Sequence, residues 1–137
     1  MPVGTTSGGE RLVLVDSSSW IHFLRPDGDL AVRARVSAAL EAGSARWCAM
    51  VRLELWNGAR GDREKKVLRE FERLIPELDT SADIWEDAFA LARRCRAAGC
   101  TVPASDLLIY ACAAANGAML EHADNDFDKI NAIAPSP

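Results

Sequence analysis

The feature that most constrains the fold is a short apolar run, Leu12–Val15, which ends directly in the carboxylate Asp16. The run is rich in β-branched residues and does not alternate with polar residues. It therefore predicts a strand covered on both faces, as the strands of parallel sheets are. In open α/β sheets, ligands bind beyond the carboxyl ends of the strands. Asp16 is thus predicted to lie where such a sheet would place a functional site.

The rest of the chain alternates helical segments with further short apolar runs. Apolar residues at helical spacing, together with Gly or Pro at segment ends, predict six helices. These cover residues 17–25, 30–42, 51–59, 65–75, 81–97 and 103–116. Strands are predicted at 47–50 and 118–121, with a last candidate at 130–133. This alternation predicts an α/β sandwich with a mainly parallel sheet.

Length and composition fit one ordinary globular unit. The chain has 137 residues, of which 49% are hydrophobic and 26% charged, as in a typical single domain. We expect residues 1–11 to form a flexible leader and residues 12–137 to form one domain. No apolar run resembles a signal peptide or a membrane span, so a cytoplasmic location is expected. Reduced thiols are expected at Cys48, Cys95, Cys100 and Cys112.

Charge and missing motifs exclude several classes of function. A net charge of −4 argues against a protein that holds nucleic acid by general electrostatics. It leaves room for an enzyme whose bound divalent cations reverse the local charge. No paired cysteine spacing indicates a zinc site, and the glycine-rich phosphate-binding turns and the serine-nucleophile elbow are missing from the sequence.

Acidic residues follow two of the predicted strands. Asp16 ends the first, and Asp124 and Asp126 come shortly after the strand at 118–121. Each position also has a structural explanation. Asp16 could cap the helix that follows it, and the later acids could cap a C-terminal helix or imitate part of a calcium-binding loop. From these segments alone, both explanations stay open.

Two more carboxylates lie on predicted helices near the core. Glu54 stands in an apolar segment, with Gly58 one turn further along, and an ionised glutamate is seldom buried without a partner or a metal. The alternative is a surface ion pair with Arg52 or Arg60. Asp106 opens a helix that is apolar nearly all round, where the helix dipole would also stabilise it.

Together these five acids predict a site for a divalent cation. Carboxylate oxygens are hard ligands that select Mg²⁺, with Mn²⁺ as a substitute. Their mutual repulsion would be costly without a cation, so a bound metal should stabilise the fold. The expected core of the site is Asp16, Asp106 and Asp124, with Glu54 and Asp126 in support.

Four segments that carry these residues resemble the PIN-domain family, and within it the VapC-type ribonuclease toxins of bacterial toxin–antitoxin pairs. The segments are Val13–Ile21, Glu54 with Gly58, Asp106–Ala111 and Leu120–Ile130. The resemblance extends over nearly the whole chain from Leu12. It implies a Rossmann-like three-layer α/β/α fold, a homodimer, and inhibition by a cognate VapB-like antitoxin. It also implies Mg²⁺-dependent cleavage of RNA, often tRNA.

Carried over by position, the resemblance makes Asp16, Glu54, Asp106 and Asp124 the catalytic quartet and Asp126 a further metal ligand. Many relatives have Thr or Ser two residues before the last quartet aspartate, whereas this chain has His122. The predicted function is an endoribonuclease toxin that inhibits translation and growth. The alternative is a catalytically silent α/β module that binds RNA or a protein partner.

Two clusters have two interpretations each. Basic residues near Glu54 could contact phosphate or form an ordinary solvated helix face, which the sequence favours; they are Arg52, Arg60, Arg63, Lys65 and Lys66. Apolar residues after Asp16 could pack in the core or contact a second protein chain; they are Trp20, Ile21, Phe23 and Leu24.

Overall fold

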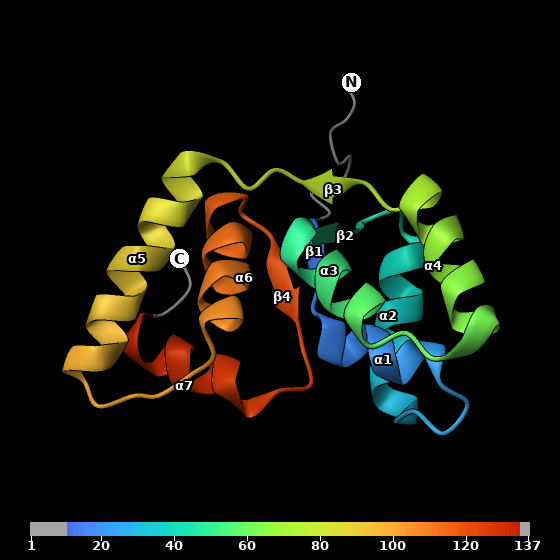
Figure 1. Ribbon diagram of the computed structural model, residues 1–137, viewed down its shortest axis with the longest axis horizontal. Coiled ribbons are helices and arrows are strands. Elements are labelled where there is room, and N and C mark those ends of the chain that lie inside the picture. Colours follow the sequence, from blue (N-terminus) through green and yellow to red (C-terminus); the bar gives the residue numbers. More distant parts are fainter. Residues whose placement is uncertain (1–10, 135–137) are drawn as a thin grey trace.

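A computed structural model of the chain describes residues 11–134. The expected leader, apart from Arg11, lies outside the described residues. The strands are β1 (Val13–Val15), β2 (Ala45–Cys48), β3 (Glu77–Leu78) and β4 (Met119–Glu121). The helices are α1 (Ser17–Leu24), α2 (Leu30–Glu41), α3 (Ala49–Asn57), α4 (Gly61–Leu74), α5 (Ala82–Ala97), α6 (Ala104–Ala115) and α7 (Asn125–Ile133) (Figure 1).

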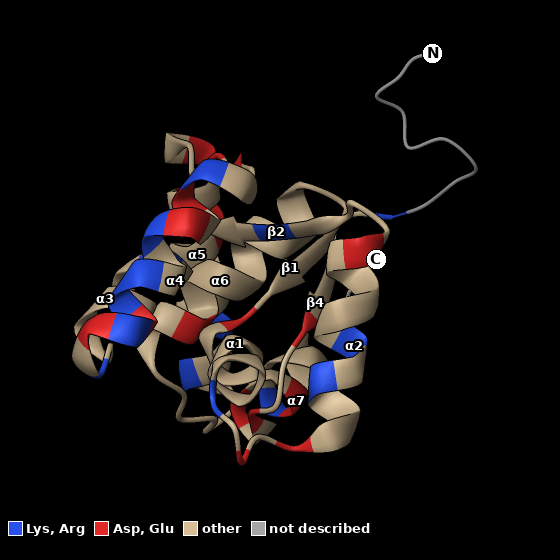
Figure 2. Cartoon of the chain, turned by 90° about the vertical axis from the view of Figure 1, so that its right-hand side faces the viewer, with Lys and Arg blue, Asp and Glu red and all other residues tan. Residues whose placement is uncertain are grey.

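The four strands form one parallel sheet in the order β3-β2-β1-β4. Leu14 of β1 is in register with Arg46 on one side and with Leu120 on the other. Helix α2 covers one side of the sheet, and α3 and α6 cover the other (Figure 2). The predicted three-layer α/β/α architecture with a parallel central sheet is therefore confirmed.

The strand order reverses beside β1. The chain passes from β1 to β2 on one side of it, whereas β4 returns to its other side. In doubly wound sheets, the crevice at such a point receives the ligand. Asp16 follows β1 directly, and its backbone N–H donates to the carbonyl of Glu121 at the end of β4, at 2.9 Å. The two strand ends that carry the predicted acids are thus neighbours.

Two predictions about secondary structure were wrong, and one strand was missed. The segment 130–133 is the end of α7, not a strand, since Phe127 and Ile130 are buried at helical spacing. The strand predicted at 47–50 lies two residues earlier, and Met50 belongs to α3. Strand β3 was not predicted, because two residues are too few to show a period.

Four aromatic rings pack together where α1 and α4 meet β2. Trp20 is fully buried, and its ring centroid lies 5.2 Å from that of Phe71 and 6.2 Å from those of Phe23 and Trp47. Each such pair adds about 0.5 to 1.5 kcal/mol beyond the burial of its area. Trp20 is therefore a core residue, whereas Ile21 remains 36% exposed.

Helix α6 runs through the interior, as its apolar sequence predicts: Asp106–Ala113 are all buried. All four cysteines are free thiols, and only Cys100 among them is partly exposed. Within residues 11–134, no helix combines the length and the apolar character that a membrane crossing requires.

Candidate functional site

Asp16 lies at the carboxyl end of β1 and caps α1. Its Oδ2 accepts hydrogen bonds from the backbone nitrogen (3.0 Å) and the hydroxyl (2.6 Å) of Ser18. Its Oδ1 is buried and has no hydrogen-bond partner among the described residues. Burial raises the pKa of Asp16, although the bonds from Ser18 act in the opposite direction. Asp16 therefore caps α1, but the cap provides hydrogen bonds for only one of its two carboxylate oxygens.

Asp106 lies in the first turn of α6 and is 6% exposed. Its Oδ2 is likewise buried without a hydrogen-bond partner in the described part of the chain. Burial, and then the charges of Asp16 and Asp124, raise the pKa of Asp106 to about 7. A carboxyl group in this state would readily exchange its proton for a cation.

Asp124 caps α7, and its Oδ1 accepts a hydrogen bond from the backbone nitrogen of Asp126 at 2.9 Å. One carboxylate oxygen each from Asp106, Asp124 and Asp126 lies within 4.8 Å of the other two. Asp16 is not in this group of three, but its charge raises the pKa of Asp106. The structure therefore groups Asp126 with Asp106 and Asp124, whereas the prediction from sequence grouped Asp16 with those two residues.

Glu54 projects from α3 toward the same end of the sheet. The hydroxyl of Ser17 donates to its Oε1 at 2.9 Å. Burial raises the pKa of Glu54, and the charge of Asp16 adds to the effect. The predicted alternative of an ion pair with Arg52 or Arg60 is wrong, since neither arginine pairs with Glu54 in the described structure and the Arg52 Nε lies 2.7 Å from a carboxylate oxygen of Glu77.

The three serines after Asp16 each hold a different part of this region. Ser17 binds Glu54, and the hydroxyl of Ser18 both donates to Asp16 and accepts from the backbone nitrogen of Ala123 at 3.0 Å. Ser19 donates to Glu121, as described below. These serines were not predicted from the sequence as part of the site. The signal that was available is three consecutive hydroxyl residues directly after a strand-ending acid.

Glu121, at the end of β4, was not singled out from the sequence. Its Oε2 accepts from the hydroxyl of Ser19 at 2.8 Å, and its Oε1 lies 2.8 Å from Nε of Arg35. Both oxygens therefore have partners within the protein. This carboxylate joins β4 to α1 and α2 and is a structural group.

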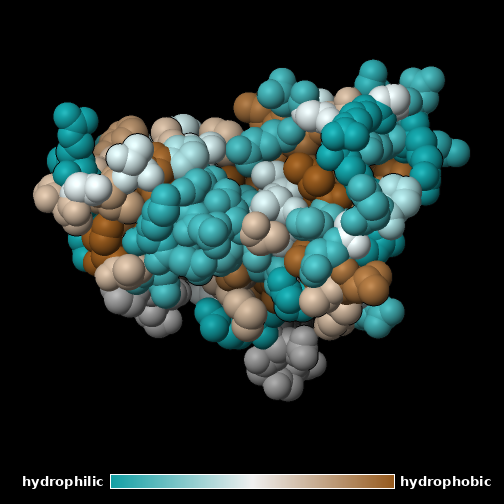
Figure 3. Space-filling model, turned by 90° about the horizontal axis from the view of Figure 1, so that it is seen from below, coloured by the Kyte–Doolittle hydropathy of each residue, from teal (hydrophilic) through white to brown (hydrophobic). Residues whose placement is uncertain are grey.

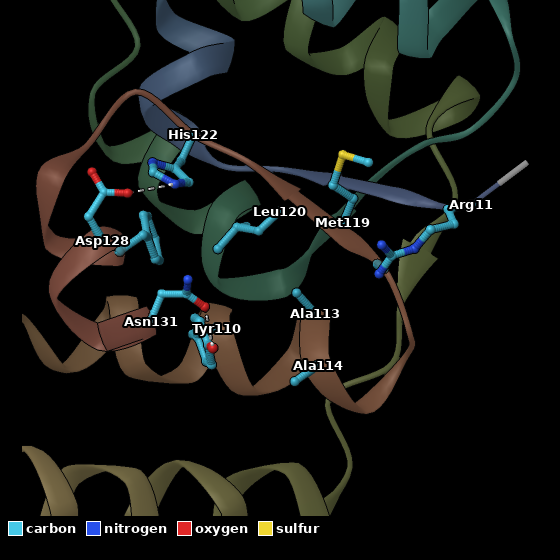
Figure 4. A pocket seen from close by; sticks show the side chains of 11 residues that line it. Arg11, Tyr110, Ala113, Ala114, Met119, Leu120, His122, Asp128 and Asn131 are labelled. Atoms are coloured by element: carbon cyan, nitrogen blue, oxygen red, sulfur yellow. Dashed lines mark hydrogen bonds and ion pairs between the residues drawn. The ribbon is translucent and has the colours of Figure 1, made fainter. Parts of the chain in front are cut away.

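His122 supports Asp124 through the backbone. Its Nδ1 accepts a hydrogen bond from the Asp124 nitrogen at 3.3 Å, and its ring lies 5.0 Å from that of Phe127. Beyond it, a cavity of about 290 Å³ opens between β4, α6 and α7. Figure 4 shows His122 and Asp128 at one end of this cavity and Arg11 at the other. None of the five predicted acids lines it.

The arrangement fits a divalent cation. Carboxylate groups come together from the segments that follow β1 and β4 and from the first turn of α6. Two of their oxygens are buried without a partner among the described residues, which is costly for a carboxylate unless a cation binds it. The face toward which the strands run is largely hydrophilic (Figure 3).

A family model described as PIN domain matches residues 13–133. The chain belongs to the PIN domain family. Among curated relatives, Ribonuclease VapC11 of Mycobacterium tuberculosis is 33% identical over 125 residues, covering 89% of this chain and 93% of the relative. VapC ribonuclease Mb1587 of Mycobacterium bovis matches with the same identity and coverage. Ribonuclease VapC18 of M. tuberculosis is 32% identical, with 90% of each chain covered.

Solved structures share the PIN fold at low sequence identity. One of them is a structure of VapBC2 from Rickettsia felis, bound to a DNA fragment from the VapBC2 promoter. It superposes with a TM-score of 0.69 at 14% identity, covering 90% of this chain and 93% of that one. FitAcB from Neisseria gonorrhoeae superposes with a TM-score of 0.66 at 19% identity, with 88% and 94% covered. Similarity at this level supports the fold.

Proposed function

We propose that this PIN domain chain is a metal-dependent endoribonuclease and the toxin of a VapBC-type toxin–antitoxin pair. Relatives at about 33% identity over most of the chain are named VapC ribonucleases. The observation that carries the metal dependence is the pair of buried, unpartnered oxygens on Asp16 and Asp106. They lie on carboxylates at the switch point of the sheet.

Asp16, Asp106 and Asp124 would hold Mg²⁺, with Asp126 as a further ligand and Mn²⁺ as a substitute metal. A bound cation offsets the charge of a phosphodiester and makes water a better nucleophile. Glu54 would orient the attacking water, and the hydroxyl of Ser17 holds its carboxylate in place.

The protein's own groups prepare the site for this chemistry. Ser18 fixes one oxygen of Asp16 and leaves the other free. Near neutral pH, the raised pKa of Asp106 lets a proton relieve the repulsion between the acids until a cation replaces it. His122 and the Asp126 backbone fix Asp124 at the start of α7.

The proposal extends to partners and setting. We assign residues 12–137 to one nuclease unit in the cytoplasm that forms a homodimer. A VapB-like antitoxin would inhibit it, which is supported by similarity to a structure of VapBC2. Its substrate would be RNA, with tRNA the first candidate, and cleavage would inhibit translation and growth.

Measuring RNA cleavage with and without a divalent metal tests this proposal. Purified protein should cut RNA in Mg²⁺ or Mn²⁺, lose activity in EDTA and regain it when the metal is restored. The Asp16→Asn variant keeps the size of the side chain and should be inactive. Cleavage that is unaffected by EDTA would overturn the metal site. A folded wild-type protein that cleaves no RNA in any metal would instead favour the silent binding module.

A further inference from the structure

Two of the four cysteines lie at the carboxyl end of α5, where the chain turns toward α6 (Figure 1). The backbone N–H of Cys100 donates to the carbonyl of Cys95 at 2.8 Å, and the N–H of Gly99 donates to the carbonyl of Arg96 at 3.1 Å. Gly99 has a left-handed φ of 73° less two degrees of rounding, that is 71°. These two bonds around a left-handed glycine form a Schellman motif, which returns the residue after the glycine to the last turn of the helix.

The two positions that this motif brings together commonly hold apolar side chains, but here both hold cysteines. Their thiols hydrogen-bond with each other. A disulfide requires Cα atoms about 4.4 to 6.8 Å apart. The backbone hydrogen bond of 2.8 Å between Cys95 and Cys100 keeps their Cα atoms within the upper limit. A bridge between the two sulfur atoms therefore needs little movement of the backbone.

The two thiols differ in their access to solvent. Cys95 is 2% exposed, whereas Cys100 is partly exposed. Burial raises the pKa of the Cys95 thiol, which keeps it protonated and disfavours its direct attack on an oxidant. A dissolved oxidant therefore meets Cys100 first, with Cys95 beside it to react second. Cysteines that respond to oxidants are often exposed and adjacent to a second thiol of this kind.

The other two cysteines form a pair of the opposite kind. Cys48, directly before α3, and Cys112 of α6 also hydrogen-bond through their thiols. They are only 1% and 0% exposed, so a dissolved oxidant reaches neither sulfur atom in the folded protein. Contact between thiols is therefore common to both pairs. Access from solvent distinguishes the pair at the end of α5.

We propose that Cys95 and Cys100 form a reversible oxidation site for peroxides. The thiolate of Cys100 attacks one oxygen of hydrogen peroxide, the O–O bond breaks and hydroxide leaves, so that Cys100 becomes a sulfenic acid. The sulfur of Cys95 then attacks the sulfur of Cys100. The S–O bond breaks, and the leaving hydroxide takes the Cys95 proton and departs as water. In total, the two thiols lose two electrons and two protons, and one peroxide becomes two waters.

The bridge would protect the exposed thiol from permanent damage. A sulfenic acid that meets no second thiol is oxidised further to sulfinic and sulfonic acids, which ordinary thiols do not reduce. A disulfide, in contrast, is reversed by thiol exchange. Because it joins two residues that are already in contact, the bridge leaves α5 and the start of α6 in place, and Asp106 lies in the first turn of α6. The oxidation site is independent of the proposed nuclease activity.

Treatment of the purified full-length chain with hydrogen peroxide, followed by mass spectrometry of the intact chain and of its peptides, tests the proposal. Wild type should lose the mass of two hydrogen atoms through a Cys95–Cys100 disulfide, and dithiothreitol should restore the original mass. The thiols of Cys48 and Cys112 should react at least about tenfold more slowly. Cys48→Ser, the matched change in the buried pair, should form the same Cys95–Cys100 disulfide as wild type.

Two variants separate the roles of the two thiols. Cys95→Ser removes the second thiol, so Cys100 should gain oxygen atoms that dithiothreitol does not remove. Cys100→Ser removes the first nucleophile, so Cys95 should stay unmodified. The wild-type result decides the proposal even if a variant fails to fold. A wild type in which Cys100 gains oxygen without forming the bridge, in which Cys48 and Cys112 react as fast, or in which peroxide leaves all four thiols unchanged would overturn it.

Discussion

The ends of β1 and β4 lie side by side, and each carries a carboxylate, but the two carboxylates are in opposite states. Glu121, at the end of β4, has a partner for each oxygen, in Ser19 and Arg35. Asp16, after β1, has partners for one oxygen only, and its other oxygen is buried without any in the described chain. Adjacent positions on one sheet edge thus differ in whether the fold supplies partners for both oxygens of the carboxylate.

The two carboxylates differ because the fold places a basic side chain beside Glu121 and none beside Asp16 in the described part of the chain. Arg35 on α2 reaches Glu121, whereas no Lys, Arg or His in the described range forms an ion pair with Asp16, Asp106 or Asp124. A buried carboxylate without a cation is expensive, so such a group must take a proton or bind a metal. An unpaired buried acid is therefore a stronger indication of a site than an acid at a strand end.

The largest expected contrast is in activity. Asp16→Asn should lower kcat/KM for RNA roughly 100-fold or more, since even residues behind metal ligands cost 10- to 100-fold. Glu121→Gln, the matched amide change on the neighbouring strand, should stay within a few-fold of wild type. The measurement is the initial rate of cleavage in Mg²⁺. Equal losses in the two variants would break the distinction between the two carboxylates.

Metal should stabilise the fold through the unpaired acids. With Mg²⁺ at a hundredfold excess over its dissociation constant, the wild type should gain about 2.7 kcal/mol, or roughly 10 °C in Tm. Glu121→Gln should gain as much, while Asp106→Asn should gain much less. Calorimetry with and without EDTA measures these shifts, and an equal rise in all three proteins would mean that the ion binds elsewhere.

Glu121 should matter for stability instead. Replacing its carboxylate by an amide weakens charge-assisted hydrogen bonds to Ser19 and Arg35, which should lower the free energy of unfolding by about 1 to 2 kcal/mol. Urea denaturation in EDTA gives this value. An Asp16→Asn variant, which removes an uncompensated charge, should lose less stability or gain some. The opposite ranking would contradict the assignment of roles.

The smallest expected effect is a change in how thermal stability depends on pH. Burial and the neighbouring acids raise the pKa of Asp106 from its ordinary value of 3.8 to about 7 in the folded protein, so the folded state holds this proton more tightly than the unfolded state. The contribution of Asp106 to the free energy of unfolding is largest at low pH, and it is lost as pH rises toward and through about 7. In EDTA, the Tm of wild type should fall by roughly a few degrees relative to Asp106→Asn between about pH 5 and about pH 8. A constant difference would mean that Asp106 is ionised throughout.

Local patterns predicted the parts of the fold that are long or strongly apolar. The run before Asp16, the periodic helix α5 and the buried helix α6 each carry a clear signal in sequence. The end of the last helix, residues 130–133, was predicted as a strand because its two isoleucines were considered without Phe127. A C-terminal helix capped near Asp124 was the open alternative, and the structure confirms it. Strand β3 exists through pairing with β2, which no local pattern records.

The candidate site was predicted from acids that follow strands, and those residues lie together. The sequence could not predict which of these acids lie closest together or which lack partners, because both depend on contacts between distant segments. Asp126 lies in one group with Asp106, which is 20 residues earlier in the chain, and with Asp124, whereas Asp16 is not in that group. Whether an acid has a partner is also a tertiary property: Arg35 is 86 residues from Glu121 in the chain. Sequence can therefore nominate carboxylates, while the structure tells which of them lack a cation.

Direct titration with Mn²⁺, followed by the loss of its free-ion EPR signal, tests the central claim that the unpaired carboxylates form a cation site. Wild type and Glu121→Gln should bind Mn²⁺ with similar affinity, and Mg²⁺ should displace it. Asp16→Asn and Asp106→Asn should bind at least about tenfold more weakly. Equal binding by all four proteins, or no binding by the folded wild type, would contradict the claim.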